Sequence, residues 1–298
     1  MYQAEILRLK REKEAVILAH FYQYPEVQDI ADFVGDSLDL SRMAQATSAK
    51  IIVFCGVNFM AETAKILSPE KKVLLPAATA GCPMAMMINR EKLQKYKRLH
   101  PERKIICYVN SYADVKAESD VCVTSSNAEK IIMHFRDEKM LYVPDKNLGA
   151  YLRYRYGLDI EVWPGYCIVH DRLVEDDVKA MRAQYPDARV LIHPEAPLAV
   201  LKLADFVGST RAIINHAAAS PAKEFIIGTE EGILHPLRKQ NPDKTFHILN
   251  PAMVCRNMKK TTLKEVYEAL LEEKHEIMVE EETRLRAKRA LDRMLELS

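Results

Sequence analysis

The chain has 298 residues, of which 48% are hydrophobic and 29% are charged, so it has enough apolar material for folded cores and is not a disordered chain. Its 43 Lys and Arg residues balance 42 Asp and Glu residues, which leaves a net charge of +1. This balance provides neither the basic surface typical of nucleic-acid binding nor a polybasic membrane signal. The nine glycines are too scattered to form a dinucleotide-binding or phosphate-loop motif.

The beginning of the chain, MYQAEILRLKREKEAVILAH, is charged and amphipathic, which favours a helix and not a secretion signal. The longest uncharged stretch, 73–89, is interrupted by glycine and proline and is too short to cross a bilayer. The six cysteines form no CxxC pair, which argues against a disulfide framework, ordinary zinc ribbons and ferredoxin clusters. We therefore expect a cytoplasmic protein without nucleic-acid or membrane partners, in which any metal has ligands far apart in the chain.

One pattern occurs three times along the chain. In each copy an apolar run ends at a polar anchor residue, an aspartate follows twelve residues later, a hydroxyl residue comes five residues after that, and a cysteine closes the copy. Four features in the same register predict a triplicated unit of about 85 residues. In chain order, the anchors are His20, Tyr108 and His193, the aspartates Asp32, Asp120 and Asp205, the hydroxyl residues Ser37, Ser125 and Thr210, and the cysteines Cys82, Cys167 and Cys255.

Each unit alternates β-rich apolar runs with helical stretches, which is typical of a parallel α/β sheet. The predicted strands lie in AVILA, IIVFCG and KVLLP, then in KIICYV, MLYVP and IEVWP, and finally in RVLI, EFIIG and FHILNP. We predict an α/β protein of three homologous three-layer α/β/α units around a pseudo-threefold axis. The expected units are 14–86, with an N-terminal helix in 1–13, then 87–172 and 173–258. A C-terminal helical arm, 259–298, opens with a capping box from Thr262 to Glu265.

The three cysteines that close the units follow loops rich in Gly, Pro or Asn, and their equivalent positions predict that they converge on a metal. Three thiolates suit zinc or an iron–sulfur cluster. A four-iron cluster with three cysteine ligands leaves one iron open as a Lewis acid, whereas zinc needs a fourth ligand, for which His170 is the candidate. The other cysteines lie within or beside predicted strands and are expected to be small buried hydrophobes: Cys55, Cys107 and Cys122.

Polar residues also gather at the carboxyl ends of the predicted first strands, where parallel α/β sheets bind ligands. Residues two apart on a strand share a face, so each unit presents one pair of polar side chains there. Glu195 is the only carboxylate in these pairs and is the natural candidate for proton transfer, with the other members orienting and polarising a substrate. The pairs are His20 with Tyr22, Tyr108 with Asn110, and His193 with Glu195.

The repeated hydroxyl residues precede predicted helices. Each one either caps its helix or contacts an anion at the positive end of the helix dipole, and both roles are compatible. Three helix starts that face one centre would suit substrates with several carboxylates and a phosphate. These residues are Ser37, Ser125 and Thr210.

Stretches distributed along nearly the whole chain closely resemble the quinolinate synthase A family of NAD biosynthesis. They are LAHFYQYPEVQDIADFVGDSLDLSR, AGCPMA, YVNSYADVKAESDVCVTSSNA, WPGYCIVH, HPEAP, GSTRAII and NPAMVCRNMKK. The resemblance implies a transferase of pyridine nucleotide biosynthesis that condenses iminoaspartate with dihydroxyacetone phosphate to give quinolinate, phosphate and water. It also implies an aspartate oxidase or dehydrogenase as the source of iminoaspartate.

The resemblance further implies a [4Fe-4S] cluster with one open iron, held by Cys82, Cys167 and Cys255. The implied catalytic residues are Glu195, as the base for isomerisation and dehydration, with Tyr22, Tyr108, His20 and His193. The implied substrate-binding residues are His20, Ser37, Tyr108, Asn110, Ser125, His193, Glu195 and Thr210, with the phosphate near Ser125 or Thr210. The alternative from the residues alone is a non-catalytic iron–sulfur or zinc protein that binds or senses a small anion.

Overall fold

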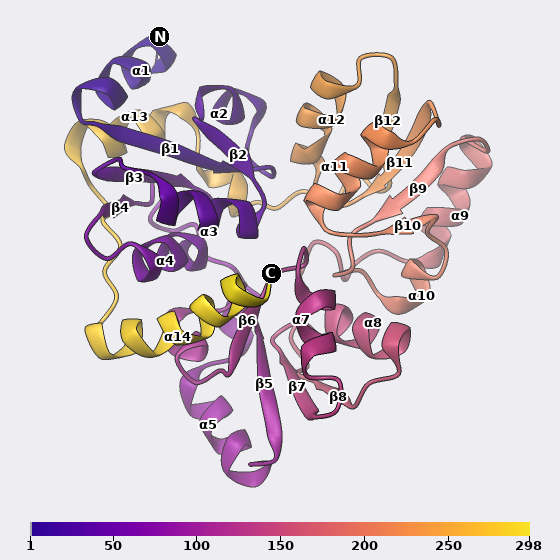
Figure 1. Ribbon diagram of the computed structural model, residues 1–298. Coiled ribbons are helices and arrows are strands. Elements are labelled where there is room, and N and C mark those ends of the chain that lie inside the picture. The colour runs from indigo at the N-terminus through magenta and orange to yellow at the C-terminus, as the bar shows by residue number, and fades with distance from the viewer. Residues whose placement is uncertain (1) are drawn as a thin grey trace.

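The computed structural model describes residues 2–298, which form three four-stranded parallel sheets (Figure 1). The first sheet contains β1 (Ala15–His20), β2 (Phe33–Gly35), β3 (Ile51–Cys55) and β4 (Lys72–Leu74). The second contains β5 (Arg103–Tyr108), β6 (Val121–Val123), β7 (Lys139–Val143) and β8 (Ile160–Val162). The third contains β9 (Arg189–Ile192), β10 (Phe206–Val207), β11 (Glu224–Gly228) and β12 (Thr245–Ile248).

Helices pack on these sheets, and the predicted fold of three α/β/α units is confirmed (Figure 1). Beside the first sheet are α1 (Tyr2–Glu12), α2 (Pro25–Ile30), α3 (Ser37–Ala46) and α4 (Asn58–Leu67). The second unit has α5 (Arg90–Leu99), α6 (Ala113–Lys116), α7 (Ala128–His134) and α8 (Lys146–Tyr156). The third has α9 (Glu175–Gln184), α10 (Leu198–Leu201), α11 (Thr210–Ala219) and α12 (Leu234–Gln240). None of the helices within residues 2–298 combines the length and the apolar character that a membrane crossing needs.

All three sheets have the same strand order, in which the first strand of the unit lies between the second and the third: β2-β1-β3-β4, β6-β5-β7-β8 and β10-β9-β11-β12. The nine predicted strands are present. The short second strands β2, β6 and β10 were not predicted, because two or three residues are too few to show a strand period. They form by pairing with the first strand of their unit, as in the register of Phe206 with Leu191.

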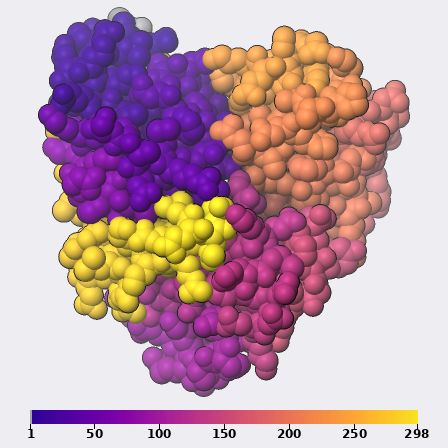
Figure 2. Space-filling view, viewed as in Figure 1, coloured from indigo at the N-terminus to yellow at the C-terminus, as the bar shows by residue number. Residues whose placement is uncertain are grey.

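The C-terminal arm consists of α13 (Leu263–Glu272) and α14 (Glu281–Leu297). The predicted capping box is present, because Glu265 accepts from the backbone N–H of Thr262 at 3.0 Å. Helix α13 packs on α1, whereas α14 contacts α4 of the first unit and α6, β6 and α7 of the second. In Figure 2 helix α14, in yellow, lies along the boundary between the first and second units. Arg286 of α14 pairs with the buried carboxylate of Glu118 at 2.7 Å, which anchors α14 to the second unit.

Candidate active site

One cavity is lined by residues of all three units and encloses about 790 Å³, including the space at its mouth. Every candidate site residue of the sequence analysis lines it. These residues are His20, Tyr22, Ser37, Cys82, Tyr108, Asn110, Ser125, Cys167, His193, Glu195, Thr210 and Cys255.

Two of the three anchor residues make the same local hydrogen bond. His20 ends β1, and its Nδ1 accepts from the backbone N–H of Tyr22 at 3.1 Å. His193 follows β9, and its Nδ1 accepts from the backbone N–H of Glu195 at 3.3 Å. Burial lowers the pKa of both His20 and His193 to about 3. These two imidazoles are therefore neutral at neutral pH, and Nδ1 of each is the acceptor nitrogen.

The three hydroxyl residues of the repeat do not cap their helices, although capping was one of the two roles expected of them. Helices α3 and α11 begin at Ser37 and Thr210, but their caps are the preceding residues, Asp36 and Ser209. The carboxylate of Asp36 accepts from two backbone N–H groups of the first turn of α3. Ser125 lies in the turn before α7 and does not cap that helix either. The three predicted hydroxyl residues are thus not N-caps, because a neighbouring side chain already fills that role or, at α7, no side chain does.

The three helix starts are joined to one another across the unit boundaries. Ser126, next to Ser125, donates its hydroxyl to Asp36 at the start of α3 and contacts the hydroxyl of Ser209, the cap of α11, at 2.7 Å. The hydroxyl of Ser125 itself lies 3.1 Å from Nε2 of His193. This network connects parts of all three units and fixes how their helix starts approach the cavity.

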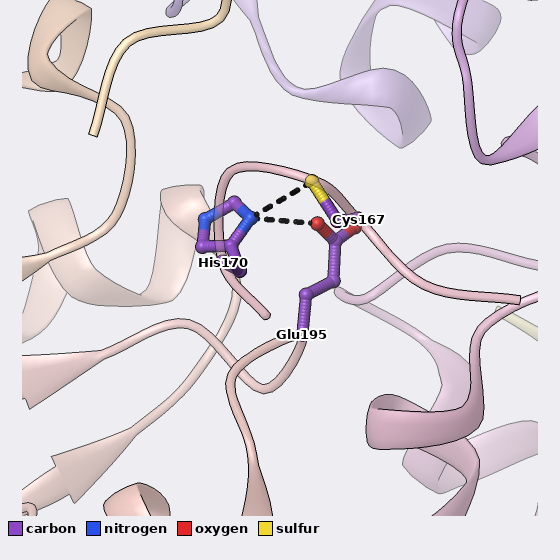
Figure 3. A group of neighbouring side chains, drawn as sticks. All are labelled: Cys167, His170 and Glu195. Carbon is purple, nitrogen blue, oxygen red and sulfur yellow. Dashed lines mark hydrogen bonds and ion pairs between the residues drawn. The ribbon is translucent and has the colours of Figure 1, made fainter. Parts of the chain in front are cut away.

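Glu195 is the centre of the polar side of the cavity and is only 4% exposed. The hydroxyl of Tyr108 donates to its Oε1 at 2.6 Å, and Nδ1 of His170 lies 2.8 Å from its Oε2 (Figure 3). Burial alone would raise the pKa of Glu195, but the neighbouring His170 and the hydrogen bonds from His170 and Tyr108 hold that pKa below its usual range. The site therefore presents an ionised carboxylate with two fixed partners.

The sequence analysis did not identify two residues that adjoin Glu195 or its partner, His170 and Thr229. His170 was considered only as a fourth zinc ligand, and Thr229 was not singled out. The hydroxyl of Thr229 lies 2.9 Å from Nε2 of His170 and 2.7 Å from the hydroxyl of Tyr22, which also lies 3.0 Å from the hydroxyl of Thr210. Thr229 directly follows β11, so its place at the carboxyl edge of the third sheet was the available signal.

The three cysteines of the repeat lie in the loops after β4, β8 and β12, and all are free thiols. Burial raises the pKa of Cys82 to about 12, with smaller contributions from the neighbouring Cys255 and Glu195. Burial likewise raises the pKa of Cys167, with added contributions from Glu195 and the other two cysteines. Partly buried thiols that line one cavity need a cationic group to become thiolates. Three thiolates are a donor set that suits an iron–sulfur cluster.

The remaining cysteines do not reach this cavity. They are completely buried, lie in strands β3, β5 and β6, and line none of its walls: Cys55, Cys107 and Cys122.

A buried ion pair orients the loop of the third cysteine. Glu230 accepts from the backbone N–H of Cys255 at 3.1 Å and from that of Gly232 at 2.7 Å. Lys259 lies 3.0 Å from the same carboxylate and donates to the backbone carbonyl of Tyr22 at 2.8 Å. The pair connects the Cys255 loop to the segment after β1, so it ties a candidate metal ligand to a candidate catalytic residue.

Cys167 also belongs to a second donor set. The ligand atoms of Cys167, His170 and Glu195 all lie within 4.8 Å of one another, and Figure 3 shows them pointing toward a common point. The sulfur of Cys167 is 3.3 Å from Nδ1 of His170. One thiolate, one imidazole and one carboxylate would suit a single divalent ion such as zinc.

Residues 4–296 match the family described as Quinolinate synthetase A protein. The chain is 54% identical to a protein named Quinolinate synthase from Alkaliphilus metalliredigens, over 98% of this chain and 97% of that protein. It is 51% identical to a protein of the same name from Methanoregula boonei, over 100% of this chain and 98% of the relative. The identity to the Quinolinate synthase of Clostridium perfringens strain 13 is 49%, over 98% of each chain. The match covers all three sheets and the arm.

Proposed function

This chain belongs to the quinolinate synthetase A protein family, and we propose that it is a transferase that makes quinolinate for NAD biosynthesis. In the proposed reaction iminoaspartate condenses with dihydroxyacetone phosphate, and phosphate and two waters leave. An enzyme that oxidises aspartate would supply the iminoaspartate. The observation that carries the proposal is one cavity to which three units bring the Glu195 carboxylate, five tyrosine and histidine side chains and three free thiols.

The lining of the cavity supports substrates that carry carboxylates and a phosphate. Ser37 and Thr210 are the first residues of α3 and α11, where free backbone N–H groups and the helix dipole favour anions. Asn110 has a buried Oδ1 without a hydrogen-bond partner among residues 2–298, so its amide is free to bind a ligand. We place the phosphate near Ser125 or Thr210.

The polar groups around Glu195 support proton transfer. We assign Glu195 as the base of the isomerisation and dehydration steps, because its carboxylate is ionised, buried and fixed by Tyr108 and His170. Burial raises the pKa of the phenols of Tyr22 and Tyr108, so both are hydrogen-bond donors. The neutral imidazoles of His20 and His193, with these phenols, orient and polarise the substrate.

We further propose that Cys82, Cys167 and Cys255 hold a [4Fe-4S] cluster. The support for this cluster is the donor set: three free, partly buried thiols from three separate loops that line one cavity. When bound, such a cluster has one iron without a protein thiolate, and this iron supplies a Lewis acid that helps a hydroxyl group to leave.

A second candidate function rests on the group of Cys167, His170 and Glu195. With a single zinc ion there, the chain would be a zinc protein that binds a small anion, and Glu195 would be a ligand and not a base. The two candidates differ in metal content and in turnover.

The test of the proposed function is quinolinate formation by the chain purified without oxygen, with iminoaspartate generated during the assay. We expect the wild type to form quinolinate and Glu195→Gln to lose about 100-fold or more in kcat, within the range of general acid–base catalysis. Glu175→Gln, at the exposed start of α9, is the matched control and should keep wild-type activity. Absence of quinolinate with the wild type would refute the function, and an active Glu195→Gln variant would refute the base.

A further inference from the structure

Each of the three repeated cysteines begins the same kind of turn. The backbone carbonyl of the cysteine accepts from the N–H of the residue four positions later, at 3.3 Å for Cys82, 2.9 Å for Cys167 and 3.1 Å for Cys255. At Cys255 that fourth residue is Lys259. The turn shapes all three cysteine loops, so by itself it does not distinguish one loop from another.

The Cys255 loop has one contact that the other two loops lack. Among residues 2–298, Cys255 is the one repeated cysteine whose backbone N–H bonds to a charged side chain, the carboxylate of Glu230, at 3.1 Å. Nζ of Lys259 lies 3.0 Å from the same carboxylate oxygen. Glu230 thus holds the N–H of Cys255, the backbone of Lys259 holds its carbonyl, and the ion pair joins the two. These contacts close a ring around the backbone of Cys255.

The ion pair has almost no contact with solvent. The side chain of Glu230 is completely buried, and that of Lys259 is 7% exposed. A buried charge is strongly destabilising when its partner is removed. The ammonium of Lys259 therefore lets a carboxylate bond to the Cys255 backbone without leaving an uncompensated negative charge beside the thiol.

The pair also fixes the loop to the first unit. Nζ of Lys259 donates to the carbonyl of Tyr22 at 2.8 Å. A Cβ at Gly232 would lie 2.6 Å from the carbonyl oxygen of Phe21, so glycine permits the close approach of the two segments there. Gln28 donates to the carbonyls of Phe21 and Gly232, each at 3.0 Å. The position of the third cysteine loop is therefore set against the segment that follows β1.

We propose that Glu230 and Lys259 are positioning residues, which hold the Cys255 thiol in the place where it binds the cluster. The inference rests on the proposed function, in which Cys255 is the third cluster ligand. Substitution of the groups that orient a metal ligand typically lowers metal affinity by about 10- to 100-fold. Loss of the ion pair should therefore weaken cluster retention without removing any of the three thiols.

The first test is the release of iron to EDTA from the full chain purified without oxygen. Lys259→Met keeps a long apolar side chain, removes the ammonium and leaves Glu230 buried without its partner. We expect iron release to be about 10-fold faster or more than in the wild type. When Lys259→Met is combined with Glu230→Gln, no unpaired charge remains and an amide oxygen is still present to accept from Cys255. Release should then return to within about threefold of the wild-type rate.

Two exposed charges nearby in the chain provide the matched controls. The side chains of Glu231 and Lys264 are 46% and 58% exposed, and within residues 2–298 neither hydrogen-bonds to the backbone of Cys255. Glu231→Gln and Lys264→Met should release iron within about twofold of the wild-type rate. Wild-type release in Lys259→Met, or equally fast release in the single and the double variant, would overturn the proposal.

The second test separates the positioning of one loop from a general loss of stability. Backbone hydrogen exchange, read by mass spectrometry, compares the peptide that contains Cys255 with peptides from β1 and β11. In Lys259→Met we expect exchange to accelerate by about 10-fold or more in the Cys255 peptide and to keep its wild-type rate in the two strands. Unchanged exchange at Cys255, or an equal rise in all three peptides, contradicts a positioning role.

Neither test needs quinolinate formation. If the wild type holds iron and sulfide but forms no quinolinate, the proposed reaction fails, and both tests still decide the role of the pair. If the wild type holds no iron and sulfide, Cys255 is not a cluster ligand and the positioning role fails with it.

Discussion

Asp120 accepts a hydrogen bond at 2.7 Å from the backbone N–H of Ile105, which lies fifteen residues earlier in the chain. The backbone N–H of Asp120 donates in return to the carbonyl of Ile105 at 3.1 Å. This double contact joins the start of β6 to β5, and it recurs in the other two units. The equivalent carboxylate bonds are Asp32 with Ile17 at 2.8 Å and Asp205 with Val190 at 2.7 Å. The repeated aspartates therefore join the second strand of each sheet to the first, and they do not line the cavity.

The first prediction follows from this bond. Asp120→Ala should lower the free energy of unfolding by about 1.5–3 kcal/mol, the usual range for a hydrogen bond to a charged group, because the N–H of buried Ile105 loses its partner. The measurement is urea unfolding at neutral pH. Asp137→Ala is the control, since the side chain of Asp137 is 91% exposed, and its effect should stay within about 0.5 kcal/mol. Equal losses in the two variants would contradict a structural role for the repeated aspartate.

The second prediction concerns the cysteines. Substituting Cys82, Cys167 or Cys255 by Ala should remove bound iron and acid-labile sulfide, because a four-iron cluster needs all three thiolates. The measurements are iron, sulfide and zinc content and the visible spectrum of protein purified without oxygen. The matched controls, which should keep iron and sulfide near wild-type levels, are Cys55→Ala, Cys107→Ala and Cys122→Ala.

Two outcomes would refute the cluster assignment. Stoichiometric zinc without sulfide in the wild type would support the single-ion site of Cys167, His170 and Glu195 instead. Equal behaviour of the two groups of cysteine variants would show that position in the repeat does not identify the ligands.

The third prediction concerns pH and the arm. Glu273, just after α13, pairs with Lys13 at 2.7 Å and with Lys72 of β4 at 2.6 Å, and its side chain is 31% exposed. Hydrogen bonds from Lys13 and Lys72 lower the pKa of Glu273 to about 2. A carboxyl group whose pKa is lower in the folded chain stabilises the fold above its unfolded pKa of about 4.3, and this contribution is lost as the pH falls toward 2.

Glu273→Gln should therefore lower the free energy of unfolding by up to about 1 kcal/mol at pH 7, the upper limit for pairs exposed to solvent. The difference from the wild type should shrink as the pH falls from about 4.3 toward 2, because the unfolded chain then binds a proton at Glu273 that the folded chain binds only near pH 2. Urea unfolding of the wild type and of Glu273→Gln at pH 7 and at pH 3 measures this difference in the free energy of unfolding. Glu272→Gln, at a 55% exposed side chain, is the control. A difference that grows on acidification would contradict the assignment.

Much of the site was predictable because the chain repeats itself. Equivalent positions in homologous units lie at the same edge of their sheets, so register alone pointed to His20, Tyr108 and His193 and to the three cysteines. The same register marked the aspartates, but it gave no sign that Asp120 bonds to Ile105 instead of lining the cavity. A repeated residue is constrained either by the sheet or by the ligand, and spacing does not distinguish the two.

The sequence by itself determined the triplicated α/β architecture, the family and the set of residues at the strand ends, because these depend on local periodicity and on motifs a few residues long. Only the tertiary structure decided that Thr229 joins Tyr22, 207 residues away, to His170, and that Ser126 joins Asp36 to Ser209. A hydrogen bond depends on the distance between two atoms after three separate units have packed together. No spacing within one unit encodes that distance.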